Sequence, residues 1–571
     1  MLFTTNVTLD NHAECWHSID WRKANRVVRN LRRRIFRATR EGNLKKVRSL
    51  QKLLLKSFSN LVLAVRRCTQ ENQGKRTAGI DGRIALTPKE RWELVCELQV
   101  LNDSIASPTR RIQIPKPNGK KRPLGIPIVT DRIRQAVVKS ALEPYWEAKF
   151  EPSSYGFRPG RSPHDAIARV QNLTKQSPQG SPPKKQWVVD ADIKGCFDNI
   201  DHHHLMGVIG NFPARKLINS WLKAGYIEKG NFHPTNGGTP QGGVISPMLA
   251  NISLHGLEDA LGVKWTIKKV KNTKSGTYAS IERSKRAVIR FADDFIILCE
   301  SEEDAQLAKE EANAFLSERG LHLSEEKTKI CHLNDGFDYL GFHIHRYPDK
   351  FKNSGYITLI TPSADKVKET KQQLREIWLQ AKGKPTEWIV NKLNPIIRGK
   401  ANYWNKVSSS RAFSDLDTYM YKRGCRFTKF QHPTKNEYWR TKRYFGRLNL
   451  NRPDKDWYFG SKSTGAYLVK FSDFNIEYHN AVPYDYTPDN PDPVVQEHFK
   501  KKDHSEATKL NKRNQRLAKK QGYKCPHCGE SLFNGEPYDV HHRVPRKDGG
   551  SDKISNLVIL HRECHKSTHH G

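Results

Sequence analysis

The sequence has 571 residues, of which 98 are Lys or Arg and 60 are Asp or Glu, so its formal net charge is +38. This length suits about three to four domains, each with its own core. The positive excess favours a polyanionic partner, because each Lys or Arg placed on a phosphate releases condensed counterions. The sequence shows no apolar run of about 20 residues and no secretory signal at its start, so we expect a cytoplasmic protein that crosses no membrane.

Residues 21–67 are predicted to be helical and strongly basic. The members of an apolar stripe at roughly helical spacing are Val27, Leu31, Ile35 and Leu44. Residues 21–50 include twelve basic residues and one acidic residue. A solvated basic face is the ordinary alternative, but this imbalance favours contact with an RNA backbone.

Residues 110–127, RRIQIPKPNGKKRPLGIP, alternate like a strand, turn at PNG and continue as a basic run. The pattern predicts a β-hairpin with Lys116 and Arg122 flanking the turn. Taken alone, this stretch is typical of an ordinary exposed basic hairpin. An amphipathic helix is expected to follow over 131–150, with Asp131 at or near its N-cap.

Carboxylates stand at the ends of two further strand-like stretches. In WVVDADIKGCFDNID, 187–201, Asp192 follows an apolar run. In AVIRFADDFIILC, 287–299, the adjacent Asp293 and Asp294 sit between two apolar runs, which predicts a hairpin with the acids at its tip. An Asp pair at a turn is more often simply solvated. Three acids on two adjacent strands can, however, hold two Mg²⁺ ions for phosphoryl transfer.

The rest of the central region mixes helices and strands, which predicts an α+β core. Residues 305–320 read as a helix ended by Gly320, and strands are expected up to residue 346. Residues 361–450 carry 20 basic and seven acidic residues interleaved with aromatic ones. A basic helical domain of this kind suits binding along RNA, although its aromatic residues are more often part of a core.

The last part of the chain is predicted to be a separable module. A Pro- and Asp-rich stretch, 484–494, reads as a linker, and a basic helix suited to a DNA backbone follows it. The residues with knuckle spacing for a structural Zn²⁺ are Cys525, Cys528, His561 and Cys564. The other seven cysteines are scattered and are expected to be reduced.

Several of these motifs resemble one family. FADD and DIKGCF are similar to the acidic motifs of reverse transcriptases, and GTPQGGVISPMLANI, 238–252, resembles the block between them that contacts template and nucleotide. Their order and spacing resemble the reverse transcriptases encoded by group II introns, and LNPIIRGKANYW, 393–404, looks like the maturase segment of such proteins. Phe291 stands where many reverse transcriptases have Tyr; the carboxylate chemistry does not need the lost hydroxyl.

This resemblance implies roles for particular residues. Lys116 and Arg122 would grip the triphosphate of an incoming dNTP, and Arg158 and Arg161 would contact the template strand. The residues implied to hold two Mg²⁺ ions are Asp192, Asp293, Asp294 and, through its carbonyl, Ile193. The residues implied to contact the nucleotide are Phe197, as a steric gate against a 2′-OH, and Gln241, beneath the nucleotide and template.

The C-terminal residues resemble an HNH endonuclease, through CPHCG, DVHHRVP and GGSDKISNLVILHRECHK. The family more often has Cys where His561 stands, and His is also a zinc ligand. By this resemblance His541 and His565 would ligate a catalytic Mg²⁺ or Mn²⁺, and His542 would be the general base that activates water. Asn556 would orient the loop of the active site. A zinc site without nuclease activity is the alternative, which the adjacent histidines and the Asn disfavour.

The expected fold is therefore multidomain, with an α+β right-hand polymerase of fingers and palm, an α-helical thumb or maturase domain and a small ββα-metal HNH domain. The expected divisions are a basic helical extension at 1–75, fingers and palm at 76–350, thumb and maturase at 351–450, a linker and DNA-binding region at 451–520, and the HNH domain at 521–571.

The sequence predicts a group II intron-encoded protein. It would bind its intron RNA and assist splicing, nick a target DNA and extend the primer so formed with dNTPs. Two alternatives are a splicing factor with a vestigial polymerase and a stand-alone reverse transcriptase. The intact acid trio disfavours the first, and the maturase and HNH segments disfavour the second.

Overall fold

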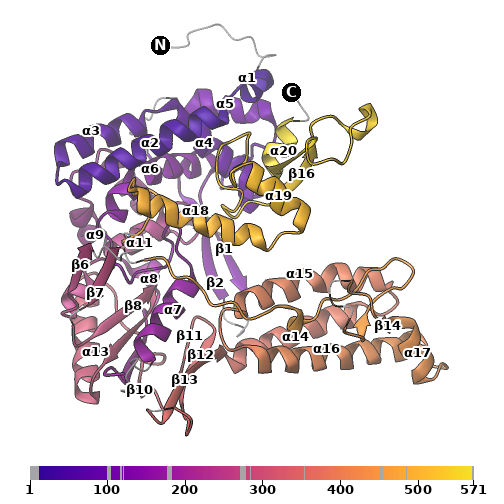
Figure 1. Ribbon diagram of the computed structural model, residues 1–571. Helices are drawn as coiled ribbons and strands as arrows, with labels where there is room; N and C mark the ends of the chain where they lie inside the picture. Colours follow the sequence, from indigo (N-terminus) through magenta and orange to yellow (C-terminus); the bar gives the residue numbers. More distant parts are fainter. Residues whose placement is uncertain are drawn as a thin grey trace.

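The computed structural model describes residues 12–99, 105–115, 119, 121–175, 183–269, 278–282, 284–352, 354–450, 452, 454–483 and 485–568. Figure 1 shows an upper lobe built by the N-terminal helices and the end of the chain, a sheet-containing region below it, and a separate helical lobe. No described helix is both long enough and apolar enough to span a bilayer.

The upper lobe begins with a helical layer. Its helices are α1 (His12–His17), α2 (Trp21–Arg40), α3 (Leu44–Leu55), α4 (Phe58–Arg66), α5 (Pro88–Leu98) and α6 (Val129–Glu147). Residues 21–67 are thus three main helices and not one, because the side chains of Asn43 and Ser57 cap new helices. Helix α2 buries Val28, Leu31 and Ile35, whereas Val27 is only partly buried and Leu44 is 47% exposed at the start of α3.

Asp131 lies in the first turn of helix α6, near the N-cap as expected, but it does not itself cap the helix. The N-cap is Ile128, and the Asp131 carboxylate accepts hydrogen bonds from the Trp221 indole at 3.1 Å and the Ser107 amide at 3.1 Å. Burial raises the pKa of Asp131, and these two hydrogen bonds oppose that rise while satisfying the buried carboxylate.

A basic β-hairpin forms as predicted. Strands β1 (Thr109–Pro115) and β2 (Lys121–Ile126) pair antiparallel from Arg110 opposite Ile126 to Pro115 opposite Lys121. Two short strands, β4 (Tyr226–Glu228) and β5 (Asn231–His233), complete a sheet of order β2-β1-β4-β5. Of the PNG turn, Pro117 and Asn118 lie outside the described residues, and Gly119 has φ +77°.

A four-stranded sheet of order β10-β3-β9-β8 carries the predicted acids. Its strands are β3 (Trp187–Asp192), β8 (Ala287–Phe291), β9 (Asp294–Cys299) and β10 (Lys329–His332). Side chains alternate between its faces, so Val189 and Ile297 join the core of the N-terminal lobe while Val188 and Ile296 join the core below. Burial on both faces fixes the register, because a slip of one residue would exchange the two cores.

Helices surround this sheet. They are α7 (Pro163–Thr174), α8 (Cys196–Asn199), α9 (His202–Ile209), α10 (Arg215–Lys223), α11 (Ser246–Ser253), α12 (Leu257–Ala260) and α13 (Glu302–Ser317), with a hairpin of β6 (Trp265–Lys269) and β7 (Tyr278–Glu282) at the side. Helix α13 begins slightly earlier than expected, and Gly320, with φ +69°, follows its end.

The helical lobe follows a three-stranded sheet of β11 (Phe337–Tyr339), β12 (Phe342–Pro348) and β13 (Tyr356–Pro362). It consists of α14 (Ala364–Gln380), α15 (Thr386–Trp404), α16 (Ser410–Gln431) and α17 (Glu437–Tyr444), with the short strands β14 (Phe445–Gly446) and β15 (Tyr458–Phe459). Trp378 and Trp404 are buried in its core, whereas Tyr438 is exposed. Aromatic residues therefore serve chiefly as core, as the sequence suggested.

The chain then returns to the upper lobe, where α18 (Pro493–Thr508) and α19 (Lys512–Lys520) precede β16 (Tyr538–His542), β17 (Leu557–His561) and α20 (Arg562–Thr568). The basic stretch is two helices and not one. The expected free linker is also wrong for the described part of 484–494. Tyr486 is buried, and Asp489 accepts two hydrogen bonds from Arg32 of α2, at 2.9 and 2.6 Å.

Candidate active sites

The three predicted acids meet at one edge of the four-stranded sheet. Asp192, the last residue of β3, lies directly opposite Asp294, the first residue of β9. Asp293 and Ala292 form the two-residue turn between β8 and β9, with Ala292 at φ +61°. Gly156 packs closely on this turn, because a Cβ added to it would lie 2.3 Å from the amide nitrogen of Ala292.

Crowding of these acids alters their protonation. Burial and the charges of Asp293 and Asp192 raise the pKa of Asp294 to about 7, although its side chain reaches solvent. Burial and the charge of Asp192 raise the pKa of Asp293 as well. Like charges held together disfavour ionisation, and a divalent cation between them would reverse that effect.

This electrostatic arrangement predicts a pH dependence of metal binding. A carboxyl group with a raised pKa must lose its proton before it binds a cation, so affinity should rise as pH increases through about 7. We expect Mn²⁺, followed by electron paramagnetic resonance on the full chain, to bind more weakly at about pH 6 than at about pH 8. Asp294→Asn should keep the Mn²⁺ binding of the nuclease histidines and lose the rise in Mn²⁺ affinity that comes from the acid trio. An unchanged pH profile of Mn²⁺ binding in that variant would contradict the assignment of Asp294 as a metal ligand.

Lys327 is a residue of this site that the sequence analysis missed. Its ammonium donates to the Asp192 carboxylate at 2.7 Å, and this bond raises the pKa of Lys327. The lysine comes from the segment between α13 and β10, which returns beside β3 through an isolated bridge between Leu323 and Ile193. Only this tertiary path places Lys327 at the acids, and nothing in SEEKTK alone indicates it.

The basic hairpin faces the acids through Arg122. The Arg122 Nε donates to the Gln241 side-chain oxygen at 2.7 Å, and the Gln241 amide donates to the Asp198 carboxylate at 3.2 Å. The charge of Arg122 also opposes the upward shift in the pKa of Asp293. Arg122 and Gln241 are thus brought together beside the acid trio. Lys116 lies outside the described residues.

Phe197 lies on the short helix α8, directly after the acid-bearing strand. Phe197 is 7% exposed, and its ring meets the ring of Phe157 edge-on with the ring centres 6.2 Å apart. Its carbonyl accepts a hydrogen bond from the Thr239 amide at 2.6 Å, which ties α8 to the GTPQGG loop. Ile193 is buried between Asp192 and this helix.

Two arginines expected to touch a template are used inside the fold. Arg158 is buried, pairs with Glu147 at 2.9 Å and donates to the carbonyls of Glu151 and Ser154. Arg161 donates to the carbonyl of Pro152 at 2.5 Å. The interpretation of Arg158 as a phosphate contact is therefore wrong, because its guanidinium already has protein partners.

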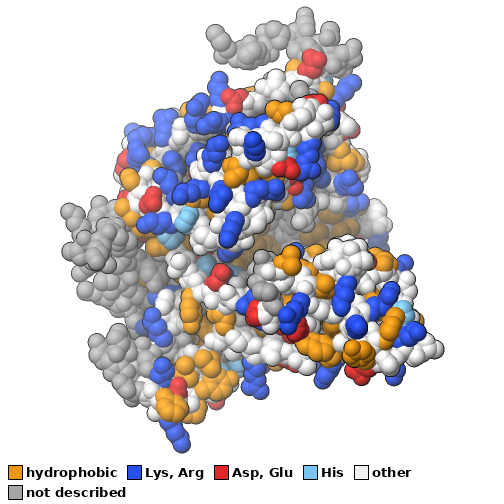
Figure 2. Space-filling view, turned by 45° about the vertical axis from the view of Figure 1, so that its right-hand side comes forward, with side chains coloured by type: hydrophobic (Ala, Val, Ile, Leu, Met, Phe, Trp, Pro, Cys, Tyr) orange, Lys and Arg blue, Asp and Glu red, His pale blue; other side chains and the backbone are white. Residues whose placement is uncertain are grey.

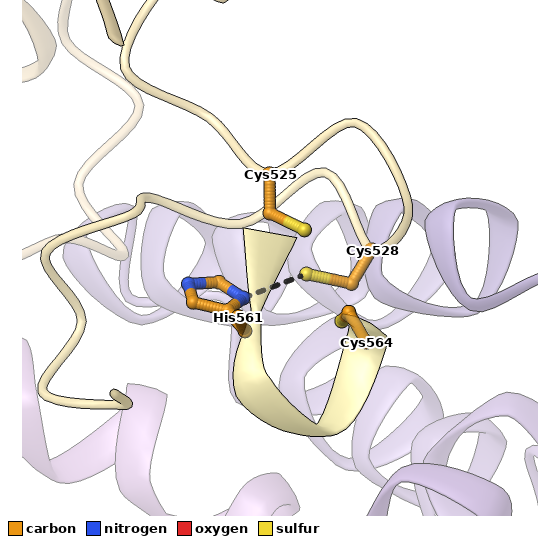
Figure 3. A group of neighbouring side chains, drawn as sticks. All are labelled: Cys525, Cys528, His561 and Cys564. Carbon is orange, nitrogen blue, oxygen red and sulfur yellow. Dashed lines mark hydrogen bonds between the residues drawn. The ribbon is translucent and has the colours of Figure 1, made fainter. Parts of the chain in front are cut away.

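The predicted zinc ligands converge in the C-terminal module (Figure 3). One potential ligand atom from each of Cys525, Cys528, His561 and Cys564 lies within 4.8 Å of the others, and all four residues are buried. The Nε2 atom of His561 lies 3.0 Å from the Ser531 carbonyl, which fixes Nδ1 toward the thiols. Three thiols and one imidazole whose far nitrogen is held by a carbonyl fit a structural Zn²⁺.

This cluster is docked on the N-terminal helices, which pass behind it in Figure 3. The guanidinium of Arg66, a 2% exposed residue of α4, donates to the Cys564 sulfur at 2.9 Å. The Asn25 side chain of α2 donates to the Cys528 carbonyl at 3.1 Å. The C-terminal module is thus part of the upper lobe, contrary to the expectation of a separable unit.

The predicted nuclease residues surround the β16–β17 ribbon. The rings of His541 and His565 lie 5.0 Å apart, and the His542 Nε2 lies 2.6 Å from the Asp552 carboxylate. Asn556 accepts from the Val544 amide at 2.8 Å and donates to the carbonyls of Val544 and Ser551, so it holds the loop that follows His542.

Asp539 is the second residue that sequence reasoning missed. It precedes His541 by two residues on β16, and its carboxylate lies 3.5 Å from the His565 Nδ1. The alternation of a strand places Asp539 and His541 on one face of the ribbon. The spacing D-x-H within DVHH is the signal that could have revealed it.

Four family models match successive parts of the chain. They are the N-terminal domain of reverse transcriptase at 16–98, reverse transcriptase (RNA-dependent DNA polymerase) at 114–344, the group II intron maturase-specific domain at 367–445, and HNH endonuclease at 525–571. The matches contain the acid-bearing strands, the segment LNPIIRGKANYW and the cysteine and histidine cluster.

Comparison with whole proteins also relates the chain to group II intron-encoded proteins. Group II intron-encoded protein LtrA of Lactococcus lactis subsp. cremoris is 32% identical over 428 residues, covering 61% of this chain and 69% of LtrA. Protein YkfC of Escherichia coli K12 is 35% identical over a region that covers 52% of this chain and 82% of YkfC. Maturase-like protein 1 of Euglena gracilis is 25% identical over a region that covers 74% of this chain and 84% of that protein. The chain therefore belongs to the group II intron-encoded proteins, and it combines a reverse transcriptase, a maturase domain and an HNH endonuclease.

Proposed function

We propose that Asp192, Asp293 and Asp294, with the Ile193 carbonyl, hold two Mg²⁺ ions for polymerisation on an RNA template. The observation that carries this proposal is the register of β3 against β9, which sets Asp192 opposite Asp294 with Asp293 at the adjoining turn. The ions would supply activation of a primer 3′-OH and stabilisation of the leaving pyrophosphate. Lys327 would neutralise Asp192 until that carboxylate is needed as a ligand.

The surrounding residues would position the nucleotide. Arg122 would move its guanidinium from Gln241 to the triphosphate, since an arginine fork binds phosphate oxygens in two places; Lys116 would assist it. Phe197 would exclude a 2′-OH, because its ring is held by packing. Gln241 would then lie beneath the nucleotide and template.

In the nuclease, His541 and His565 would hold a catalytic Mg²⁺ or Mn²⁺, joined by the carboxylate of Asp539. His542 would take the proton of the attacking water, with Asp552 stabilising the imidazolium that results. Asn556 would keep the loop after His542 in place. The Zn²⁺ on the cysteines and His561 would stabilise the fold of this module.

Together these sites support one sequence of events. The protein would bind its intron RNA and assist splicing, nick a target DNA and extend the new 3′-OH with dNTPs. The two sheets would be the fingers and palm, and α14–α17 the thumb and maturase domain. Sequencing the RNA that copurifies with the chain tests this directly: we expect an intron that carries this reading frame, and unrelated RNA alone would contradict the proposal.

The basic surface gives a further prediction for RNA binding. Figure 2 shows Lys and Arg side chains spread over both lobes. Each neutralised phosphate contributes about 0.7 to 0.9 to the slope of log affinity against log salt, so the affinity for the copurifying RNA should fall steeply with KCl. A filter-binding titration measures the slope, and a flat response would rule out phosphate contacts as the main source of affinity.

A further inference from the structure

A groove of about 450 Å³ lies between α2, α19 and the nuclease ribbon. The basic residues that line it are Arg22, Arg26, Arg29, Lys520, Lys524 and Arg543. No Asp or Glu is among its lining residues in the described part of the chain. A concave surface with cations on three sides concentrates positive potential and attracts a polyanion.

The walls of this groove are held in a fixed relation. Gln521, at the end of α19, exchanges two hydrogen bonds of 2.8 Å with the backbone of Ile559 on β17. On the opposite wall, Arg29 pairs with Glu530. The Arg22 side chain packs on Gly529, because a Cβ added to Gly529 would lie 3.1 Å from the Cγ of Arg22. With the buried Arg66 contact to the zinc cluster, these bonds make the groove a built feature of the upper lobe.

The groove adjoins the proposed nuclease base. Arg543 follows His542 directly, and Leu557, which also lines the groove, pairs with His542 across the ribbon. A polyanion seated in the groove would therefore run past the end of the ribbon where water would be activated. This continuity favours DNA at the nuclease over intron RNA as the occupant.

We propose that this groove binds the sugar–phosphate backbone of the DNA strand presented to the nuclease. Arg22 and Arg26, on a helix of the reverse transcriptase N-terminal region, would then be DNA contacts for nicking. The proposal rests on the nuclease function proposed above. The groove has the volume of a small-ligand site, so it would hold a short stretch of one backbone while the rest of the duplex lies outside.

The test uses the full zinc-loaded chain with Arg22→Gln and Arg26→Gln combined. Gln keeps the Cβ and Cγ that pack beside Gly529 and removes the charged guanidinium. A charge-matched control combines Lys23→Gln and Arg34→Gln, exposed positions on the same helix about a quarter of a turn away from the groove. Binding of a short fluorescein-labelled DNA duplex is measured by anisotropy across a range of KCl, without divalent ions so that no cutting occurs.

We expect the groove variant to bind this DNA at least about tenfold more weakly at low salt and to lose about two from its salt slope, one for each phosphate contact. It should also nick supercoiled plasmid more slowly in Mg²⁺. Primer extension on an annealed duplex and binding of the copurifying RNA should stay near wild type in both variants.

Two outcomes would overturn the proposal. Equal DNA affinity and slope in the groove variant and its control would show that the groove does not contact DNA. Loss of RNA binding with DNA binding retained would make the groove an RNA site. If the wild type and His542→Ala both fail to nick, the nuclease assignment fails, yet the anisotropy series still decides whether DNA lies in the groove.

Discussion

Asp293→Asn or Asp294→Asn is expected to lower primer extension by more than about a hundredfold, the upper end of the loss found when only a supporting residue around a metal is removed. Each substitution deletes a charged oxygen from a site where the register of β3 and β9 already holds the acids together. Binding of the copurifying RNA should stay nearly unchanged, because the phosphate contacts lie elsewhere. Single-turnover extension and filter binding on the same preparations measure both quantities.

Asp190→Asn is the matched control. Asp190 is on the same strand, two residues before Asp192, and burial together with the charge of Asp338 raises its pKa to about 6. Asp190 is therefore a carboxyl group with a raised pKa, like Asp294, but we do not assign it as a metal ligand. Near-normal extension is expected from this variant, and wild-type extension by either Asp293→Asn or Asp294→Asn would refute the assignment of the trio.

His542→Ala is expected to stop DNA nicking and leave the zinc content and primer extension unchanged. The reason is that His542 contacts Asp552 at the surface of the ribbon, whereas the zinc cluster lies among buried residues. Cys528→Ala should instead lose Zn²⁺ and then nicking, since a structural zinc contributes about 10 kcal/mol or more to folding. Zinc content, nicking and extension, measured on the three proteins, separate these roles.

The docked position of the zinc cluster adds a consequence for stability. Without folded cysteines, the buried Arg66 guanidinium loses its sulfur acceptor, and Asn25 loses the Cys528 carbonyl. We therefore expect Cys528→Ala, unlike His542→Ala, to lower the melting temperature of the N-terminal region as well. Zinc loss from His542→Ala would contradict the assignment of His542 to the nuclease site and His561 to the zinc site. An unaltered melting temperature of the N-terminal region in Cys528→Ala would contradict a stabilising contact between the zinc cluster and the N-terminal helices.

The sequence predicted those features whose residues lie close together along the chain. The acid hairpin follows from two apolar runs around Asp293 and Asp294, and the zinc set follows from ligand spacing within a short segment. The helical stripe was partly misplaced, because Leu44 belongs to a second helix that begins at the cap residue Asn43. A single capping residue such as Asn43 starts a new helix, while the apolar residues on either side keep a spacing that still looks like one helix.

Contacts between distant segments could not be predicted in this way. Lys327 reaches Asp192 only because the chain returns beside β3 after α13. Arg66 and Cys564 are separated by most of the sequence and meet inside the upper lobe, where the C-terminal module packs on the N-terminal helices. Periodicity and motif spacing describe a single element or loop, so they contain no information on which elements will meet.

The meeting of the two ends of the chain also affects the order of synthesis. Helices α2 and α4 leave the ribosome early, but the cysteines that their Asn25 and Arg66 contact are made about 500 residues later. Domains generally fold as units in the order in which they emerge. The N-terminal layer must therefore persist with an uncovered polar and aromatic face, Trp21 beneath Arg66 included, until Cys528 and Cys564 have been made. A nascent chain arrested before Cys525 would expose this face to chaperones, while the finished chain conceals it.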